Sequence, residues 1–189
     1  MVKSEISFVE VDKKNRKTAI KIQKEIFPLE CGEFDINASV SGEIPSWDSF
    51  IKYYLIKQDK AFVGICGVYA YKDYPKDAWL AWFGVLEPFR RKGIGTLALN
   101  FCIETAREMG YETFRLYTDD VENATAIELY KKIGMNGEEY TNKKDLHFEV
   151  GKTFVFSLSL NGKKPALWKN KRLYLKEHDT ANNILKNQP

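Results

Sequence analysis

The fold is decided by residues 85–96, which read Val-Leu-Glu-Pro-Phe-Arg-Arg-Lys-Gly-Ile-Gly-Thr. An almost wholly apolar run over 78–85 leads into this stretch and predicts a strand that is covered on both faces. Beyond the stretch, apolar side chains recur at three- and four-residue steps over 96–109, which predicts a helix. Gly93 and Gly95 allow backbone conformations and close approaches that a Cβ atom would forbid. The stretch therefore predicts a strand, a short glycine loop and a helix in direct succession.

This junction has the properties of an anion site. The first turn of a helix leaves N–H groups without intrahelical partners, and the helix dipole makes that end positive. Arg90, Arg91 and Lys92 add attraction for an anion. The arrangement predicts a cradle of the size of a phosphate. The alternative is a tight turn that carries solvated basic side chains.

The two common nucleotide loops do not match this cradle. A Walker loop places Lys and then Ser or Thr after its last glycine, whereas Thr96 and Leu97 follow Gly95 here. A dinucleotide loop expects a further glycine at position 98, where the chain has Ala98, and an acidic residue at the end of the next strand. No acidic residue stands at the expected distance.

The remaining patterns predict an α/β fold, with a largely antiparallel mixed sheet of about 6–7 strands between helices on both faces. Ile6, Phe8 and Val11 indicate a first strand, and residues 28–46 hold prolines and glycines typical of loops or short broken helices. We expect helices over 15–27, 96–109 and 124–133, and strands over 53–57, 61–71, 78–85, 114–118, 135–140 and 154–160. Residues 146–150 fit either a strand or a loop.

Composition limits the class of protein. The 189 residues are 44% apolar and 14% aromatic, enough for a core of one domain. No apolar run approaches the roughly 20 residues of a transmembrane helix, and residues 1–10 lack the features of a signal peptide. Cys31, Cys66 and Cys102 show no CxxC spacing, so we expect no disulfide framework, no metal site and a cytoplasmic protein.

Charge divides the chain into two parts. Residues 161–189 carry seven basic and two acidic side chains, a net charge of +5, so the rest of the chain has −2. We expect a domain over 1–160 and a basic C-terminal extension over 161–189 whose end is loose. Leu167, Trp168, Leu173 and Leu175 predict that the extension docks on the body or across a homodimer contact. The acidic body makes nucleic acid an improbable partner.

A second motif gives the loop its context. Residues 123–135 read Asn-Ala-Thr-Ala-Ile-Glu-Leu-Tyr-Lys-Lys-Ile-Gly-Met. Together, residues 90–95 and 123–135 resemble the GNAT superfamily of N-acetyltransferases, across about residues 5–160. The first fits the pattern Arg/Gln-x-x-Gly-x-Gly/Ala. The second fits Asn-x-x-Ala-x-x-Leu-Tyr-x-x-x-Gly-Phe, with Met135 in place of the usual Phe.

The resemblance implies a GNAT-type fold that binds acetyl-CoA and releases CoA. It places the pyrophosphate beside Arg90, on the backbone N–H groups of Arg91, Lys92, Gly93, Ile94, Gly95 and Thr96. It places the pantetheine arm along the main chain of Phe83, Gly84 and Val85, with an N–H near Val85 polarising the thioester carbonyl. Asn123 would face the same arm, or cap the helix that follows it, or do both.

The resemblance also implies an activity: direct acetyl transfer to a primary amine of a small molecule or peptide, in a ternary complex. Tyr130 matches the tyrosine that protonates the departing thiolate; the alternative is a core aromatic. A catalytic base is harder to place, because residues 79–85 hold no carboxylate. The candidates are Glu30, Glu33, Asp35, Asp119, Asp120, His147 and a chain of water molecules. The missing carboxylate also permits a CoA-binding sensor without turnover.

The acceptor of the acetyl group is suggested by charge alone. Residues 28–46 carry Glu30, Glu33, Asp35 and Glu43 and no lysine or arginine, which favours a cationic amine. The alternative is a solvated acidic loop.

Overall fold

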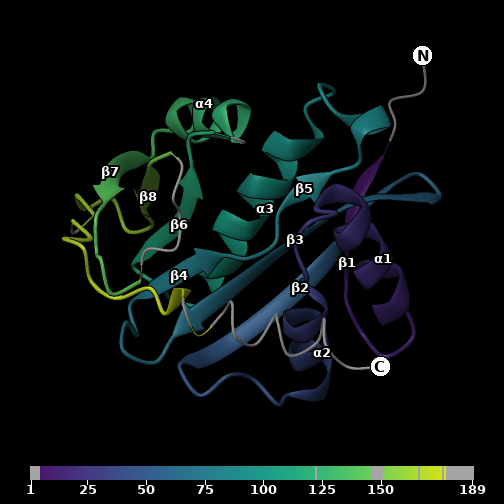
Figure 1. Cartoon of the computed structure of the whole chain (residues 1–189). Coiled ribbons are helices and arrows are strands. Elements are labelled where there is room, and N and C mark those ends of the chain that lie inside the picture. The colour runs from purple at the N-terminus through teal and green to yellow at the C-terminus, as the bar shows by residue number, and fades with distance from the viewer. Residues whose placement is uncertain (1–4, 122, 146–150, 166, 176, 178–189) are drawn as a thin grey trace.

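The computed structural model describes residues 5–121, 123–145, 151–165, 167–175 and 177, and Figure 1 shows the path of the chain. Its elements are, in chain order, β1 (Ile6–Glu10), α1 (Arg16–Ile26), α2 (Glu33–Ser41), β2 (Asp48–Gln58), β3 (Ala61–Tyr71), β4 (Asp77–Leu80), β5 (Gly84–Val85), a 3₁₀ turn (Glu87–Phe89), α3 (Ile94–Glu108), β6 (Thr113–Asp119), α4 (Ala124–Lys132), β7 (Asn136–Tyr140) and β8 (Thr153–Ser159).

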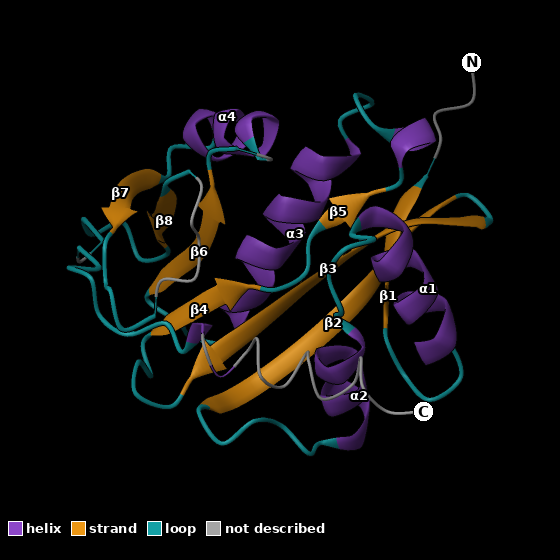
Figure 2. Cartoon of the chain, viewed as in Figure 1, coloured by secondary structure: helices purple, strands orange, loops and turns teal. Residues whose placement is uncertain are grey.

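One mixed sheet organises the described residues. Its strand order is β1-β2-β3-β4-β6-β8-β7, and β5 pairs with β3 beside this path. The β4–β6 pair is parallel and the other pairs are antiparallel. Figure 2 shows α1 and α2 on one side of the sheet and α3 and α4 on the other. The predicted mixed α/β class is thus confirmed. The sheet has eight strands in the described part of the chain, because the apolar run over 78–85 forms two.

That run was predicted as one continuous strand, and this was wrong. Leu80 of β4 pairs with Val68, and Gly84 of β5 pairs with Ile65. The three residues between Leu80 and Gly84 therefore face only two residues of β3, which is a β-bulge. A bulge breaks the alternation of side chains along a strand, and here the consecutive residues Ala81 and Trp82 both pack with the α1–α2 side, while Phe83 packs with the α3–α4 side.

The helix predicted over 96–109 begins two residues earlier, at Ile94. Gly93 takes a left-handed conformation with φ of +80° at the helix N-cap, and the N–H of Leu97 donates to the carbonyl of Gly93 at 3.1 Å. The first turn therefore includes Gly95, which brings the glycine pair directly to the positive end of α3. Within 28–46, predicted as loop or short helices, α2 occupies nine residues.

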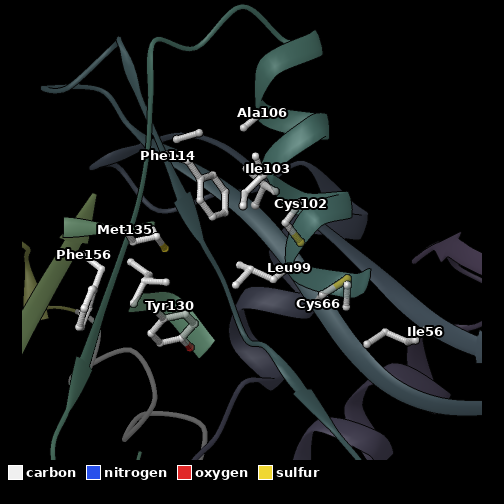
Figure 3. Close-up of a cluster of buried hydrophobic side chains, with 14 of the residues drawn as sticks. Ile56, Cys66, Leu99, Cys102, Ile103, Ala106, Phe114, Tyr130, Met135 and Phe156 are labelled. Atoms are coloured by element: carbon white, nitrogen blue, oxygen red, sulfur yellow. The ribbon is translucent and has the colours of Figure 1, made fainter. Parts of the chain in front are cut away.

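Two hydrophobic clusters lie on the two faces of the sheet. The first joins α3 and α4 to the sheet, and Figure 3 shows part of it, with Leu99, Phe114, Tyr130 and Phe156 labelled. The second joins α1, α2 and the C-terminal extension to the opposite face. Cys66 and Cys102 are buried free thiols, as expected of core cysteines.

The extension contributes to the second cluster. Trp168 has an exposed fraction of 1%, and its indole lies edge-on to Trp79 at 4.9 Å between ring centroids. It also covers Arg115, whose guanidinium carbon is 5.3 Å from the Trp168 ring and whose Nε lies 2.9 Å from Oδ2 of Asp77. Leu173 is buried too, and its carbonyl accepts a 2.7 Å hydrogen bond from the hydroxyl of Tyr71. Among the described residues, no helix has the length and apolar character needed to cross a membrane.

Candidate functional site

The sheet opens next to the bulge. Strand β6 pairs with β4 over Thr113–Arg115, while β5 pairs with β3 on the other side. The described residues therefore place no strand against the β5-facing edge of β6 beyond Arg115. Strands β5 and β6 diverge beyond this point, and Figure 1 shows this opening of the sheet beside α4 and the start of α3.

Free backbone N–H groups gather at the start of α3. In the described part of the chain, the N–H groups of residues 91–96 donate no hydrogen bond to a backbone or side-chain acceptor. The left-handed Arg91, with φ of +59°, and the left-handed Gly93 curl the loop around them. A Cβ built on Gly93 meets no atom within 4 Å, so the space in front of the loop is open. A Cβ on Gly95 would lie 3.9 Å from both Phe83 and Leu129, which form the floor.

The basic side chains of the loop have specific places. Arg90 donates from Nε to the carbonyl of Val85 at 2.8 Å, which ties the loop to the end of β5. Lys92 donates from Nζ to the carbonyl of Pro88 at 3.0 Å and lies over the Phe89 ring. All three, Arg91 included, are exposed and give the loop positive charge.

Asn123 does not cap α4 with its side chain, so that alternative was wrong. Its Nδ2 donates to Oδ2 of Asp119 at 2.6 Å, and its carbonyl accepts the first helical hydrogen bond, from Ile127. The side-chain amide therefore binds the end of β6 rather than the first turn of α4. Asn123 thereby holds the start of α4 next to the opening.

Tyr130 reaches the same region from α4. Its side chain has an exposed fraction of 5%, and its ring centroid lies 5.6 Å from that of Phe156. Figure 3 shows its hydroxyl oxygen turned away from Met135. Burial raises the pKa of this phenol above its usual range, so the hydroxyl keeps its proton. In the described structure the hydroxyl has no hydrogen-bond partner. It is a donor that is available to a ligand.

A carboxylate that the sequence placed among several candidates meets the bulge from the other side. Asp35, in the first turn of α2, accepts a 3.0 Å hydrogen bond at Oδ2 from Nε1 of Trp82. Desolvation raises the pKa of Asp35 to about 6, although the Trp82 hydrogen bond opposes this. Phe27 packs on the Trp82 indole with ring centroids 5.1 Å apart. A Cβ on Gly32 would lie 2.7 Å from Nε1 of Trp82, so glycine leaves room for this contact.

A second carboxylate belongs to the same surroundings. Asp48, at the start of β2, has an exposed fraction of 3%, and its Oδ1 has no hydrogen-bond partner. Desolvation and the charge of Asp35 raise the pKa of Asp48 to about 8. Tyr53 is buried nearby, and burial together with the charges of both carboxylates raises its pKa. Sequence analysis missed Asp48, because the strand was predicted over 53–57, whereas β2 begins five residues earlier, at Asp48.

The other base candidates are less well placed. Asp119 and Asp120 accept hydrogen bonds from the backbone N–H groups of Val121 and Lys152, which are turn-forming contacts. Glu30 and Glu33 are exposed. His147 lies outside the described residues.

The loop fits an anionic phosphate carrier. Six uncovered N–H groups, an open face at Gly93 and nearby positive charge are what a pyrophosphate requires. Within the described residues, no group of three or more histidine, cysteine, aspartate or glutamate side chains is arranged to hold a metal ion.

Comparisons with known proteins agree with this geometry. Residues 21–135 match the profile of a family described as acetyltransferase (GNAT) family. The uncharacterized N-acetyltransferase YdgE of Bacillus subtilis is 44% identical over 59 residues, which are 31% of this chain and 37% of that protein. The probable N-acetyltransferase san of Drosophila melanogaster is 25% identical over 151 residues, which are 79% of this chain and 76% of that protein.

Solved structures show the same fold. The ribosomal-protein-S18-alanine N-acetyltransferase of Escherichia coli has a TM-score of 0.64 at 16% identity, over 87% of this chain and 99% of that chain. NAA60 of Arabidopsis thaliana in complex with acetyl-CoA has a TM-score of 0.65 at 15% identity, over 84% of this chain and 100% of that chain. At these identities the likeness concerns the fold alone.

Proposed function

Because this chain belongs to the acetyltransferase (GNAT) family, as the match over residues 21–135 shows, we propose that it transfers an acetyl group from acetyl-CoA directly to a primary amine. The family resemblance predicted from the two motifs is thereby confirmed. The activity, the acceptor and the roles of individual residues are our proposal. The observation that carries it is the row of six uncovered N–H groups at the positive end of α3.

These N–H groups are proposed to bind the pyrophosphate of the cofactor, with Arg91 and Lys92 attracting it. Arg90 acts indirectly, because its hydrogen bond to Val85 fixes the loop against β5. The main chain of residues 83–85 offers the edge along which the pantetheine arm would lie. When bound, acetyl-CoA supplies a thioester carbon that an amine attacks and a thiolate that leaves. Asn123 fixes the far wall of the opening through Asp119.

Tyr130 is proposed to donate its hydroxyl proton toward the departing sulfur. A phenol is protonated at neutral pH, and burial, which raises the pKa of Tyr130, keeps it so while making it a weaker acid; its hydroxyl has no competing partner in the described structure. A CoA thiol has a pKa around 8.5, so the thiolate is already a tolerable leaving group and the proton donor is helpful rather than indispensable.

The acceptor is proposed to be a cationic primary amine of a small molecule or peptide. The acidic stretch over 28–46 supports this, because α2 brings Asp35 from that stretch to the bulge. The alternative, a CoA-binding sensor, differs in turnover alone. Release of free thiol with polyamines, aminoglycosides and peptides as acceptors separates the two, since a sensor releases none.

Cofactor binding is tested by replacing Gly93 with leucine. We expect Gly93→Leu to lose at least tenfold in affinity for CoA, because its side chain enters the open face of the loop. The matched control is Gly110→Leu at the other end of α3, where φ is +86° and a Cβ also meets no atom within 4 Å. Both variants carry the same left-handed strain, about 1–2 kcal/mol. Equal CoA affinity of the two variants, measured by calorimetry, would refute the placement of the cradle.

A further inference from the structure

Resting on the proposed function, we propose that Asp35, positioned by Trp82, is the catalytic base that takes the proton from the acceptor amine. Acetyl transfer to nitrogen needs such a base, because an alkyl ammonium with a pKa near 10.4 has no free electron pair. The central strand residues 79–85 supply no carboxylate.

The bulge gives Asp35 its position. Ala81 and Trp82 pack on the same face of the sheet, and Phe83 packs on the opposite face. Phe83 forms part of the floor below Gly95, and Trp82 holds the Asp35 carboxylate through a 3.0 Å hydrogen bond. The carboxylate is thus tied to the residue that directly precedes the strand edge proposed for the pantetheine arm. A base on α2 thereby replaces a base on the strand itself.

Unpartnered polar atoms surround this carboxylate, as expected of a site that receives a polar ligand. Gln23 of α1 has an exposed fraction of 1%, and its Nε2 has no hydrogen-bond partner in the described structure. A Cβ on Gly32 would lie 2.7 Å from Cδ of Gln23 and equally close to Nε1 of Trp82, so both side chains meet at this glycine. Oδ1 of Asp48, whose carboxyl group interacts electrostatically with Asp35, is also buried without a hydrogen-bond partner.

The ionisation of the two carboxylates suits the role. The pKa of Asp35 is about 6 and that of Asp48 about 8, so at neutral pH Asp35 is largely ionised while Asp48 keeps its proton. Two neighbouring acids with separated pKa values have distinct roles as base and proton holder. The titratable groups that share this face are Asp48 and Tyr53 from β2, Tyr69 and Tyr71 from β3, Lys72 after β3, and Tyr117 from β6.

The proposed step balances as follows. Asp35 first accepts one proton from the bound ammonium and releases it to solvent. The nitrogen of the neutral amine then bonds to the acetyl carbon as the carbon–sulfur bond breaks, and the electron pair of that bond leaves with the sulfur. Asp35 accepts the second proton from the nitrogen, and Tyr130 supplies one proton to the sulfur. Exchange with solvent restores both side chains.

The experiment is a pH profile of kcat/KM for wild type, Asp35→Asn, Trp82→Phe and Glu25→Gln, with spermidine, kanamycin and a peptide with a free N-terminus as acceptors. Wild type is expected to lose activity below about pH 6. Asp35→Asn should lower kcat about 10²–10⁴-fold and remove the acid limb of the pH profile, which is the fall in kcat/KM below about pH 6. Trp82→Phe removes a hydrogen bond that lowers the pKa of Asp35, so its limb should move upward by about one pH unit. Glu25→Gln, an exposed carboxylate on α1, should match wild type.

Cofactor affinity separates this proposal from the proposed function. Asp35→Asn and Trp82→Phe should bind CoA as wild type does, which also shows that they are folded. If Asp35→Asn keeps wild-type turnover and the limb near pH 6, the assignment of the base is overturned while acetyl transfer stands. If Trp82→Phe loses activity without a shift of the limb, the positioning by Trp82 is overturned. If wild type binds CoA but acetylates none of the three acceptors, both proposals fail.

Discussion

Replacement of Trp168 by alanine tests how firmly the C-terminal extension is attached to the body. The side chain is almost completely buried, and it donates from Nε1 to the carbonyl of Lys171 at 2.9 Å. Its backbone N–H donates to Glu138 of β7 at 2.7 Å, and its ring covers the guanidinium of Arg115. Trp168 therefore joins the extension to both β7 and β6.

The cost of this replacement follows from burial. Truncation of a buried tryptophan to alanine costs about 3–5 kcal/mol, because the site cannot collapse fully. For a chain of this size, each kcal/mol lowers the melting temperature by about 2–4 °C. Trp168→Ala should therefore lower the melting temperature by about 6–20 °C. The matched control is Leu167→Ala, whose side chain has an exposed fraction of 52% and whose loss should cost about 0.5 kcal/mol at most.

Thermal unfolding followed by circular dichroism measures both variants, and limited trypsin digestion measures local opening. Cleavage after Lys169 or Lys171 should be slow in wild type and fast in Trp168→Ala, since the tryptophan holds this segment on the sheet. Equal melting temperatures of Trp168→Ala and Leu167→Ala, with equal cleavage rates, would refute the reasoning. The boundary predicted at residue 160 would then separate a folded body from a loosely attached extension.

Two further predictions concern the two faces of the sheet. Tyr130→Phe should lower turnover about 10- to 100-fold with unchanged CoA affinity, less than a full acid–base effect because the thiolate leaves readily; thiol-release kinetics check this, and unchanged turnover would remove the role as proton donor. Asp48→Asn should raise the melting temperature more at pH 8 than at pH 5. The folded pKa of Asp48, about 8, exceeds its usual 3.8, so folding binds a proton, and wild-type stability falls as pH rises from about 4 to 8. An equal gain at both pH values would contradict this.

The glycine loop and the helix after it could be predicted from sequence because their determinants are local. The left-handed turn at Gly93, the basic residues before it and the first turn of α3 all lie within seven residues of one another. Only the start of the helix was misplaced, because the periodic apolar pattern begins after Gly95 while the hydrogen bonds begin at Gly93. The apolar periodicity therefore placed the start of α3 within two residues of its position in the structure.

The contact between Asp35 and Trp82 could not be predicted from local sequence patterns. Asp35 and Trp82 are 47 residues apart, and the first stood among seven equal candidates. What selects Asp35 is desolvation and the indole hydrogen bond, and both depend on the packing of α2 against the sheet. Arg115 was missed for the same reason. An arginine inside a buried strand needs a partner, and Asp77 becomes its partner through the parallel pairing of β4 with β6.

The bulge between β4 and β5 positions both the glycine loop and Asp35. An unbroken strand over 78–85 would place alternate side chains on alternate faces, so Trp82 would share its face with Leu80 and leave the side of α2. One extra residue reverses the alternation from Trp82 onward. The Trp82 indole therefore lies on the side of Asp35, and the Phe83 ring lies on the side of the glycine loop. The residues of the bulge carry no glycine or proline that would announce it, since the register is set by pairing with β3. The proposed base and the proposed cofactor site are therefore held in fixed relation by a single backbone irregularity, which explains how a chain without a carboxylate on its central strand can still bring one to the site.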